Sequence, residues 1–242
     1  MKLSTVQNRT ARRRGAFTLV EMLVVVSIIV LLVGILTPSF GLIRERMKRF
    51  VCASNMRQLG IAWKAYAVAN SGNLVGSNTY RDFDWVHPSG DMKTGALYPH
   101  SGRPELYKCT NPANPGYPIS YSMPGTLSGQ VDWRFVPAGA DLPWLKYQRI
   151  PNPSATLVLI EEDDWRGFNK GSWMLASENQ WIDYVAGNHE GGDNLVFADE
   201  HVEYWYWKDE NTLNLPYHDY SFYMPDPGNP DLARLWAVYW PK

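Results

Sequence analysis

The sequence predicts an α+β protein in which a long N-terminal helix precedes a small antiparallel β-sheet head with much irregular chain. Three observations indicate this fold class. Residues 22–40 carry no charged side chain over nineteen positions. Beyond them, apolar residues recur at three- and four-residue spacing as far as Tyr66, as on one face of a helix. After residue 72 that period disappears, and Pro and Gly recur between short segments rich in β-branched and aromatic residues.

The composition favours a folded, aromatic-rich body over a rod or a disordered chain. Of the 242 residues, 19% are charged and 14% aromatic, with eleven Trp and fourteen Tyr. The first sixteen residues hold five basic side chains and no acid, so the rest of the chain has 18 basic and 24 acidic residues, a net charge of −6. Nucleic-acid binding needs a basic face that neutralises phosphates, so the sequence argues against that class of partner.

The apolar run at 22–40 is long enough to cross a membrane. Nineteen helical residues span roughly 28 Å, close to the hydrocarbon thickness of a bilayer. A secretory signal has a shorter apolar region of about 7–15 residues that ends in a small-residue cleavage site. On hydropathy alone, a plain signal anchor and a twin-arginine export signal with Arg12 and Arg13 both stay open. Basic residues flank the run on both sides, so they do not fix its orientation.

A single carboxylate, Glu21, directly precedes this run. A charged group in hydrocarbon is costly unless it is paired, so an acid at this place indicates a functional role. The surrounding stretch "GAFTLVEMLVVVSIIVLLVGILTP" resembles the N-terminal cleavage and methylation motif of type IV prepilins, the family of pilins and type II secretion pseudopilins.

The resemblance implies that the N-terminus is processed. In that family a membrane-embedded prepilin peptidase removes a short basic leader, and the new N-terminal residue is N-methylated. Cleavage between Ala16 and Phe17 places the new N-terminus four residues before Glu21, as in the family. The residue before the Phe is usually Gly, whereas here Gly15 is followed by Ala16, so the Gly15–Ala16 bond stays an alternative. Pro38 falls where many pilins bend their membrane helix.

The resemblance also explains Glu21. In such filaments the acid of one subunit meets the free amino group of a neighbour's first residue, here Phe17. Opposite charges about 4 Å apart attract far more strongly in a low dielectric than in water. Each charge is costly alone in lipid, so the pair favours neighbours in register over isolated subunits. We therefore expect Glu21 and Phe17 to be assembly groups.

The function implied is that of a structural subunit of a type IV pilus-like or type II secretion pseudopilus filament, not an enzyme. The expected partners are copies of itself, other pilins or pseudopilins, prepilin peptidase and an inner-membrane assembly platform. We expect one pass through the bacterial inner membrane, with the N-terminus cytoplasmic and the head periplasmic, or at the cell surface in a pilus. Pilus or pseudopilus, and major or minor subunit, both stay open.

Beyond the apolar run the pattern stays helical as far as "NSGN", where Gly72 supplies a stop signal. Four apolar residues share one face, which both a helix docked on the head and an ordinary core-facing helix explain. They are Met56, Leu59, Trp63 and Tyr66.

The head contains three predicted strands, at 155–160, 193–198 and 201–207. Only Asp199 and Glu200 separate the last two, which predicts a hairpin. The chain is therefore expected to comprise a leader that is removed, a membrane and assembly helix, a helix that continues into the head, and the β-rich head itself, at residues 1–16, 17–40, 41–71 and 72–242.

A second resemblance covers the head. The segments "CASNMRQLGIAWKAYAVANSGNLV", "LYKCTNPANP", "IPNPSATLVLIEE" and "NHEGGDNLVFADEHVEYW" are similar to bacterial prepilin-type proteins with an H-x9-DG C-terminal domain. His189 and Asp199 match the His and Asp of that motif, but Glu200 replaces its Gly. A two-residue hairpin loop often needs a positive φ, which Gly adopts at little cost and Glu does not. The strand pairing is expected, and the turn type stays open.

The segment from His189 to His201, with Asp193 and Asp199, invites a metal-binding or catalytic interpretation. Strand alternation puts Asp199 and His201 on one face, while His189 approaches from the preceding loop. No metalloprotease, paired-Cys, nucleophile-elbow or phosphate-loop motif accompanies them. We therefore interpret His189 and Asp199 as a hydrogen-bonded pair that fixes the hairpin. The alternative function is a membrane-anchored exported enzyme, or a carbohydrate- or surface-binding protein, that uses His189, Asp199 and His201 or the aromatic head.

We expect no resident metal or cofactor and no catalytic residue. Residues 161–165, "EEDDW", offer carboxylates to calcium, which stays a minor alternative, but they lack EF-hand spacing and are more typical of a solvated surface turn. The Trp and Tyr side chains are expected to form core rather than a binding platform. Cys52 and Cys109 are expected to form a disulfide once the head is exported, and their oxidation state stays open.

Overall fold

The computed structural model confirms the α+β fold class, with an apolar N-terminal helix followed by sheets and irregular loops. The chain divides into two units, Met1–Arg44 and Glu45–Lys242. The predicted leader, with Gly15 and Ala16, lies outside the described residues. The structure describes residues 17–78, 84–87, 91–110, 116–127, 146–162, 171–215 and 223–240.

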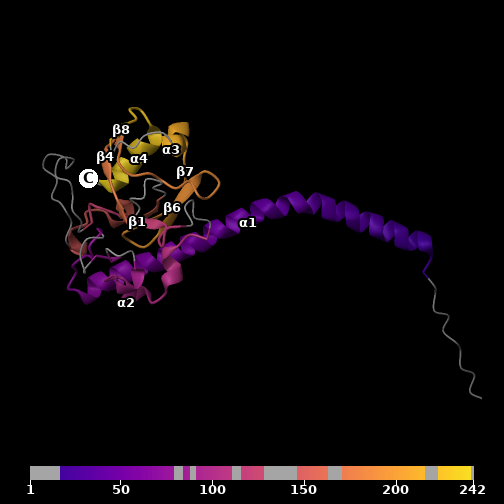
Figure 1. The fold of residues 1–242 in the computed structure, drawn as a ribbon, viewed down its shortest axis with the longest axis horizontal. Helices are drawn as coiled ribbons and strands as arrows, with labels where there is room; N and C mark the ends of the chain where they lie inside the picture. Colours follow the sequence, from indigo (N-terminus) through magenta and orange to yellow (C-terminus); the bar gives the residue numbers. More distant parts are fainter. Residues whose placement is uncertain are drawn as a thin grey trace, which may run out of the picture. The chain divides into compact units, whose positions relative to one another are not determined.

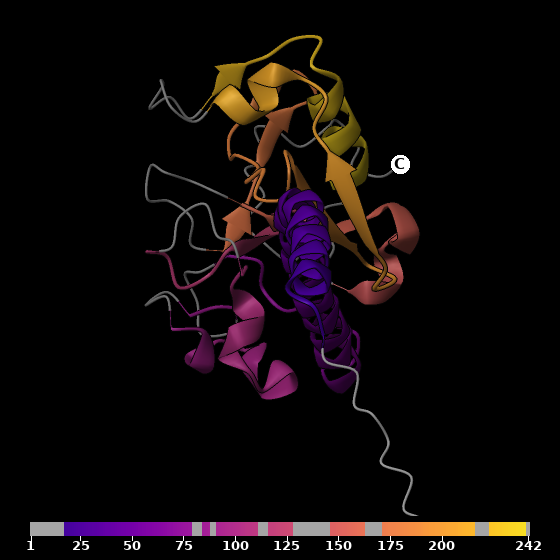
Figure 2. The same cartoon turned by 90° about the vertical axis from the view of Figure 1, so that its right-hand side faces the viewer.

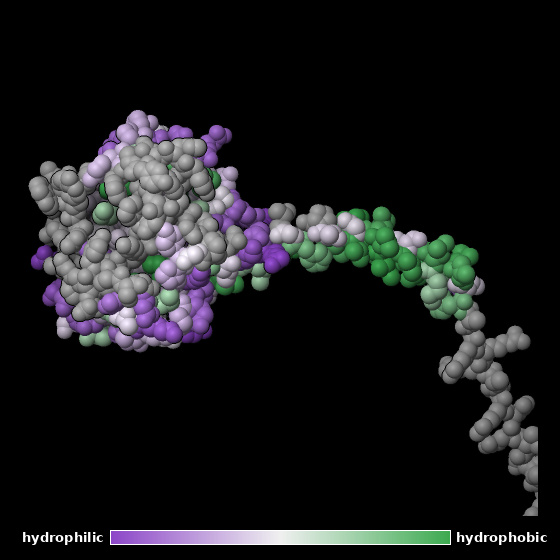
Figure 3. All heavy atoms as spheres, in the orientation of Figure 1, coloured by the Kyte–Doolittle hydropathy of each residue, from purple (hydrophilic) through white to green (hydrophobic). Residues whose placement is uncertain are grey.

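A helix of 51 residues, α1 (Leu19–Ala69), follows Phe17 and Thr18 (Figure 1). Its stretch Leu19–Thr37 is long and apolar enough to cross a membrane, and none of it is buried within the chain. The space-filling view shows hydrophobic side chains gathered along this stretch (Figure 3). The backbone stays helical through Pro38, and the bend expected there stays a prediction.

The later part of α1 buries one face, as its spacing predicts. Met56, Leu59 and Trp63 are fully buried, and Tyr66 packs against them while partly exposed. Cys52 lies one helical turn before Met56 and belongs to the same buried face. This half of the helix therefore forms part of the core of the head.

The end of α1 is also where the sequence places it. The helix stops at Ala69, and Gly72 adopts a left-handed φ of 82°. Its N–H donates to the carbonyl oxygen of Ala67 at 2.7 Å, which satisfies one of the carbonyls that a helix end leaves without a partner. The predicted stop signal is confirmed.

The main sheet has five strands in the order β3-β1-β2-β6-β7. Neighbouring strands are antiparallel, except that β1 and β3 are parallel. The three predicted strands correspond to β2, β6 and β7 and are confirmed. The strands are β1 (Tyr121–Pro124), β2 (Leu157–Glu161), β3 (Ser172–Trp173), β6 (Gly192–Phe197) and β7 (Val202–Tyr206).

A second, three-stranded sheet has the order β4-β5-β8. The expectation of one antiparallel sheet is therefore wrong in two respects, since there are two sheets and one of them is mixed. Strands of two or three residues are too short to show an alternating pattern, which explains why the sequence did not reveal them. These strands are β4 (Leu175–Ser177), β5 (Gln180–Trp181) and β8 (Met224–Pro225).

Short helices complete the head. Figures 1 and 2 both show α3 and α4 at the opposite end of the head from α2. Short 3₁₀ turns punctuate the irregular segments between them. The helices are α2 (Tyr98–Ser101), α3 (Glu210–Asn214) and α4 (Pro230–Tyr239), and the 3₁₀ turns are η1 (Met92–Thr94), η2 (Pro104–Tyr107), η4 (Tyr147–Arg149) and η5 (Pro153–Ala155).

The turn of the β6–β7 hairpin places Glu200 in a conformation that Gly adopts more easily. Glu200 adopts a left-handed φ of 73°, and its N–H donates to the carbonyl oxygen of Phe197 at 2.9 Å. This conformation costs a residue with a side chain roughly 1 kcal/mol. The Glu200 carboxylate pairs with the Lys64 ammonium of α1, a contact that Gly could not make.

Aromatic side chains form much of the core, as expected. Among the Trp residues that the structure describes, only Trp236 keeps substantial exposure. The others are distributed over two buried clusters, one that includes the inner face of α1 and one that contains β7 and α4. The buried Trp residues are Trp63, Trp85, Trp173, Trp181, Trp205, Trp207 and Trp240.

Candidate functional site

The predicted assembly residues lie at the N-terminal end of α1. Phe17 is 70% exposed, and Thr18 caps the helix. The N–H and hydroxyl groups of Thr18 both donate to Glu21 Oε2 at 2.8 Å, and the Glu21 N–H donates back to Thr18 Oγ1 at 3.2 Å. This reciprocal arrangement is a capping box, which the sequence analysis missed although Thr-x-x-Glu is its signature.

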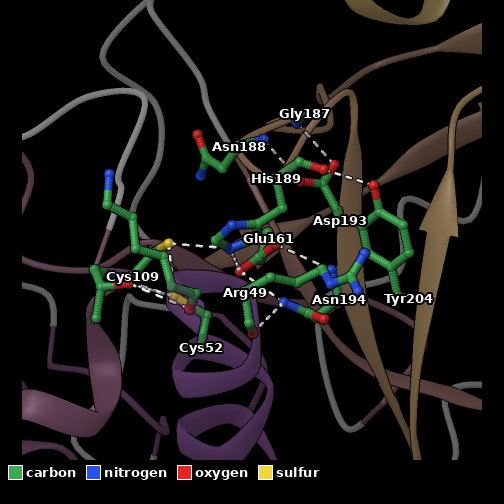
Figure 4. Close-up of polar contacts among 12 residues, drawn as sticks. Arg49, Cys52, Cys109, Glu161, Gly187, Asn188, His189, Asp193, Asn194 and Tyr204 are labelled. Carbon is green, nitrogen blue, oxygen red and sulfur yellow. Dashed lines mark hydrogen bonds and ion pairs between the residues drawn. The ribbon is translucent and has the colours of Figure 1, made fainter. Parts of the chain in front are cut away.

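A second group of polar side chains is buried between the later part of α1 and the main sheet (Figure 4). We call it the Cys–Glu–His cluster. One member comes from α1, one from the segment after η2, one from the end of β2 and one from the turn before β6. All four are at most 3% exposed. They are Cys52, Cys109, Glu161 and His189.

The polar atoms of the cluster converge. Cys52 Sγ lies 2.8 Å from Cys109 Sγ, which in turn lies 3.4 Å from His189 Nε2. The same His189 nitrogen lies 3.1 Å from Glu161 Oε1. The two cysteines are not joined by a disulfide bond in this structure, so the disulfide stays a prediction. The two sulfur atoms nevertheless lie close together, as a disulfide between these cysteines would require.

Backbone and amide donors hold two members of the cluster in place. The Asn194 N–H donates to Glu161 Oε2 at 2.9 Å, and its side-chain amide lies 3.4 Å from Glu161 Oε1. The Thr110 N–H donates to Cys52 Sγ at 3.1 Å. These donors give buried acceptor atoms of Glu161 and Cys52 hydrogen-bond partners in the interior.

His189 is fixed by a tight turn. Its N–H donates to the Gly192 carbonyl oxygen at 3.1 Å, and the Gly192 N–H returns a bond of 3.2 Å. Between them Glu190 and Gly191 both adopt positive φ. The Tyr204 hydroxyl donates to the His189 carbonyl oxygen at 2.6 Å. The imidazole therefore enters the core from a rigid backbone.

Asp193, at the start of β6, fixes the segment before that turn. Its carboxylate accepts from the N–H groups of Gly187 and Asn188, at 2.9 and 3.3 Å. The Trp207 indole also donates to it, at 2.7 Å. The role of Asp193 is thus to organise backbone.

The electrostatics of the cluster follow from burial and close contact. Hydrogen bonding to Cys109 lowers the pKa of Cys52 to about 4. Burial opposes the charged imidazole, but contacts with Cys52 and Glu161 raise the pKa of His189 to about 10. Burial and the nearby Glu161 raise the pKa of Asp193 to about 8. The interior here holds several acidic groups and a single base.

The predicted hydrogen bond between His189 and Asp199 is wrong. Asp199 Oδ1 lies 2.5 Å from His201 Nδ1, at the turn between β6 and β7. His189 lies at the other end of β6, whose six residues span roughly 20 Å. The nine-residue spacing therefore separates the two residues along a strand instead of joining them. The structure does not bring His189, Asp199 and His201 together as the alternative function requires.

The predicted solvated turn at 161–165 is wrong for its first two residues. Glu161 is drawn into the cluster by His189 and Asn194, and Glu162 is buried with its carboxylate accepting from the Ser122 hydroxyl. Residues 163–165 lie outside the described residues. Calcium binding by this segment stays an untested alternative.

The structure thus has an exposed apolar helical stretch, whose first turn is capped and carries Glu21, and a head with a buried polar cluster. A family model for the prokaryotic N-terminal methylation motif matches residues 11–37. The motif indicates a prepilin-peptidase substrate of the pilin or pseudopilin type, and proteins that carry it are structural rather than enzymatic. No curated protein and no solved structure matches the chain. The match ends at Thr37, so the H-x9-DG resemblance of the head stays a prediction.

Proposed function

We propose that the chain is a structural subunit of a type IV pilus-like or type II secretion pseudopilus filament. The observation that carries this proposal is the coincidence of the methylation motif with a fully exposed apolar helix at Leu19–Thr37. Such a surface is unfavourable in water and requires a cover of lipid or of other helices. A filament subunit uses both, lipid before assembly and neighbouring subunits after it.

The proposed topology places the basic leader in the cytoplasm and the head in the periplasm. Prepilin peptidase would cut between Ala16 and Phe17, and the exposed Phe17 would become the methylated N-terminus. The partners are copies of the same chain, other pilins or pseudopilins and an inner-membrane assembly platform.

Glu21 then has two successive roles. In the single chain its carboxylate completes the cap with Thr18. In the filament it would pair with the Phe17 ammonium of a neighbour. Two substitutions separate these roles. Glu21→Gln keeps a capping-box side chain but removes the charge, whereas Thr18→Ala removes the cap and keeps the charge.

The experiment compares the ratio of sheared filament to membrane-held subunit in the parent, Glu21→Gln, Glu21→Leu and Thr18→Ala. Breaking a buried ion pair is typically worth about 3–5 kcal/mol, and about 1.4 kcal/mol is a factor of ten, so both Glu21 variants should lose at least roughly a hundredfold in assembly. Thr18→Ala should assemble close to the parent level, because losing a cap costs only about 1 kcal/mol.

Leader removal is measured in the same samples, so that a loss of assembly is not confused with a loss of processing. Parent-like filaments from both Glu21 variants would show that Glu21 is not an assembly group. Filaments that contain no peptide of this chain would contradict the proposed function itself. The alternative of an anchored enzyme has less support, because its residues His189 and His201 lie at opposite ends of β6.

A further inference from the structure

We propose that the Cys–Glu–His cluster is a structural zinc site that fastens the later half of α1 to the main sheet. This departs from the expectation that the chain holds no resident metal. It is independent of the filament proposal, since it concerns the stability of the head alone. The four proposed ligands are Cys52 Sγ, Cys109 Sγ, Glu161 Oε1 and His189 Nε2.

The four donor atoms already stand in a compact group. One ligand atom from each residue lies within 4.8 Å of all the others. In a tetrahedral zinc site with Zn–S of about 2.3 Å and Zn–N or Zn–O of about 2.0–2.1 Å, the ligand atoms lie roughly 3.3–3.8 Å apart. The contacts of 2.8, 3.4 and 3.1 Å in the cluster need outward shifts of no more than about 1 Å.

The donor groups of the cluster are ones that a divalent cation binds. Two cysteine sulfur atoms and a Glu161 carboxyl oxygen lie around His189 Nε2, and all four side chains are buried. Buried charges are costly unless they are paired or coordinate a metal. The guanidinium of Arg49 is engaged outside the cluster, since it lies 4.2 Å from the Tyr204 ring centre and 4.0 Å from Glu190. Binding of a divalent ion would displace the thiol protons, and the ion would then offset the charges of its ligands directly.

Two of the proposed ligands, Cys52 and Glu161, have outer hydrogen-bond donors of the kind that hold metal ligands in place. Metal ligands are held by outer hydrogen bonds that orient them. Here Thr110 donates to Cys52 Sγ and Asn194 donates to Glu161, while the Tyr204 hydroxyl fixes the backbone of His189. His189 Nδ1 has no partner within the described part of the chain, so Nε2 is the ring nitrogen committed to the cluster.

A disulfide between Cys52 and Cys109 accounts for less of this arrangement. It would explain why two cysteines meet, but a disulfide carries no charge and gives no reason for a buried Glu and a buried His to converge on the sulfurs. Zinc uses all four groups. Thiolate and imidazole donors also favour zinc over calcium or magnesium, which prefer oxygen ligands.

The test uses the full chain, purified from membranes in detergent without chelator. Elemental analysis should find about one zinc per chain. After removal of the metal under reducing conditions, added Co²⁺ should give the visible bands of a tetrahedral site and a sulfur-to-metal charge-transfer band. Added zinc should protect both cysteines from alkylation. These readouts on the parent do not depend on any variant being folded.

Variants then assign the ligands. Loss of an outer partner already lowers metal affinity 10–100-fold, so Cys109→Ser and His189→Ala should each lower zinc affinity by at least roughly tenfold. His201→Ala is the matched control, because this partly exposed histidine lies at the other end of β6 and should leave the affinity unchanged. Unchanged zinc affinity in both ligand variants would show that zinc binds outside the Cys–Glu–His cluster and would contradict the proposal.

Two outcomes would overturn the proposal outright. One is a reduced parent chain that takes up neither zinc nor Co²⁺. The other is a Cys52–Cys109 disulfide, found by non-reducing peptide mapping in chain isolated from the periplasmic side. Neither outcome bears on filament assembly, which is measured separately.

Discussion

The two halves of α1 are parts of one continuous helix but bury their apolar side chains in different ways. Along Leu19–Thr37 apolar side chains lie on every side of the helix, and every side chain of this stretch is exposed. From Cys52 to Ala67 only one face is buried, and it packs into the core of the head. The first half depends on a cover from outside the chain, whereas the second half is stabilised by the chain itself. Helix length alone does not distinguish a membrane segment from a core element; the distribution of polar residues around the helix does.

The glycines of the two halves show the same contrast. A Cβ added at Gly34 would meet nothing within 4 Å, whereas one added at Gly60 would lie 2.8 Å from Val196 Cγ1 of β6. Gly60 therefore allows the helix to approach the sheet closely. Gly34 has no such neighbour within the chain, so any constraint on it comes from its surroundings.

The largest expected difference between the halves comes from one substitution made in each. Leu59 is fully buried and Leu32 is 54% exposed. Leu59→Ala should lower the free energy of unfolding of the head by about 2–5 kcal/mol. Leu32→Ala should change it by less than about 0.5 kcal/mol. Urea unfolding of the full chain in detergent, followed by Trp fluorescence, measures this, because no Trp precedes Trp63 and the signal reports the head alone. Equal effects from both substitutions would contradict the division of α1 into two differently stabilised halves.

A smaller difference is expected for the two glycines. Gly60→Ala gains about 1 kcal/mol of helix propensity but overpacks the contact with Val196, which costs about 1–3 kcal/mol. The net loss should be about 1 kcal/mol in the same unfolding experiment. Gly34→Ala should leave the unfolding of the head unchanged. A stabilised Gly60→Ala variant would mean that α1 and β6 are less closely packed than the structure indicates.

The sequence predicted those features whose signals are local. The three- and four-residue spacing of Met56, Leu59 and Trp63 fixed the buried face of α1, and the two residues between β6 and β7 fixed the hairpin. Other local signals were present but not used. Thr18 and Glu21 form the capping box, and Asn229 followed by Pro230 is an N-cap signal that precedes α4, where the Asn229 side chain accepts from the N–H groups at the start of the helix.

Most of the Cys–Glu–His cluster could not be predicted, because its contacts join distant parts of the chain. Only the approach of Cys52 to Cys109 was expected. Cys52 and Cys109 are 57 positions apart, and Cys109 and His189 are 80 apart. No motif has such spacing. Glu161 is the first residue of an acidic run, and such runs are typical of the surface. The sequence therefore did not indicate that Glu161 ends a buried strand. Strand alternation likewise indicated which residues share a face but not what packs against them.

The central claim is that α1 begins at a processed N-terminus and serves as an assembly helix. Mass spectrometry of the N-terminus of the mature chain tests this most directly. We predict a chain that lacks the first sixteen residues and begins at an N-methylated Phe17. A mature chain that keeps Met1, or that begins far from the bond between Ala16 and Phe17, would contradict the claim.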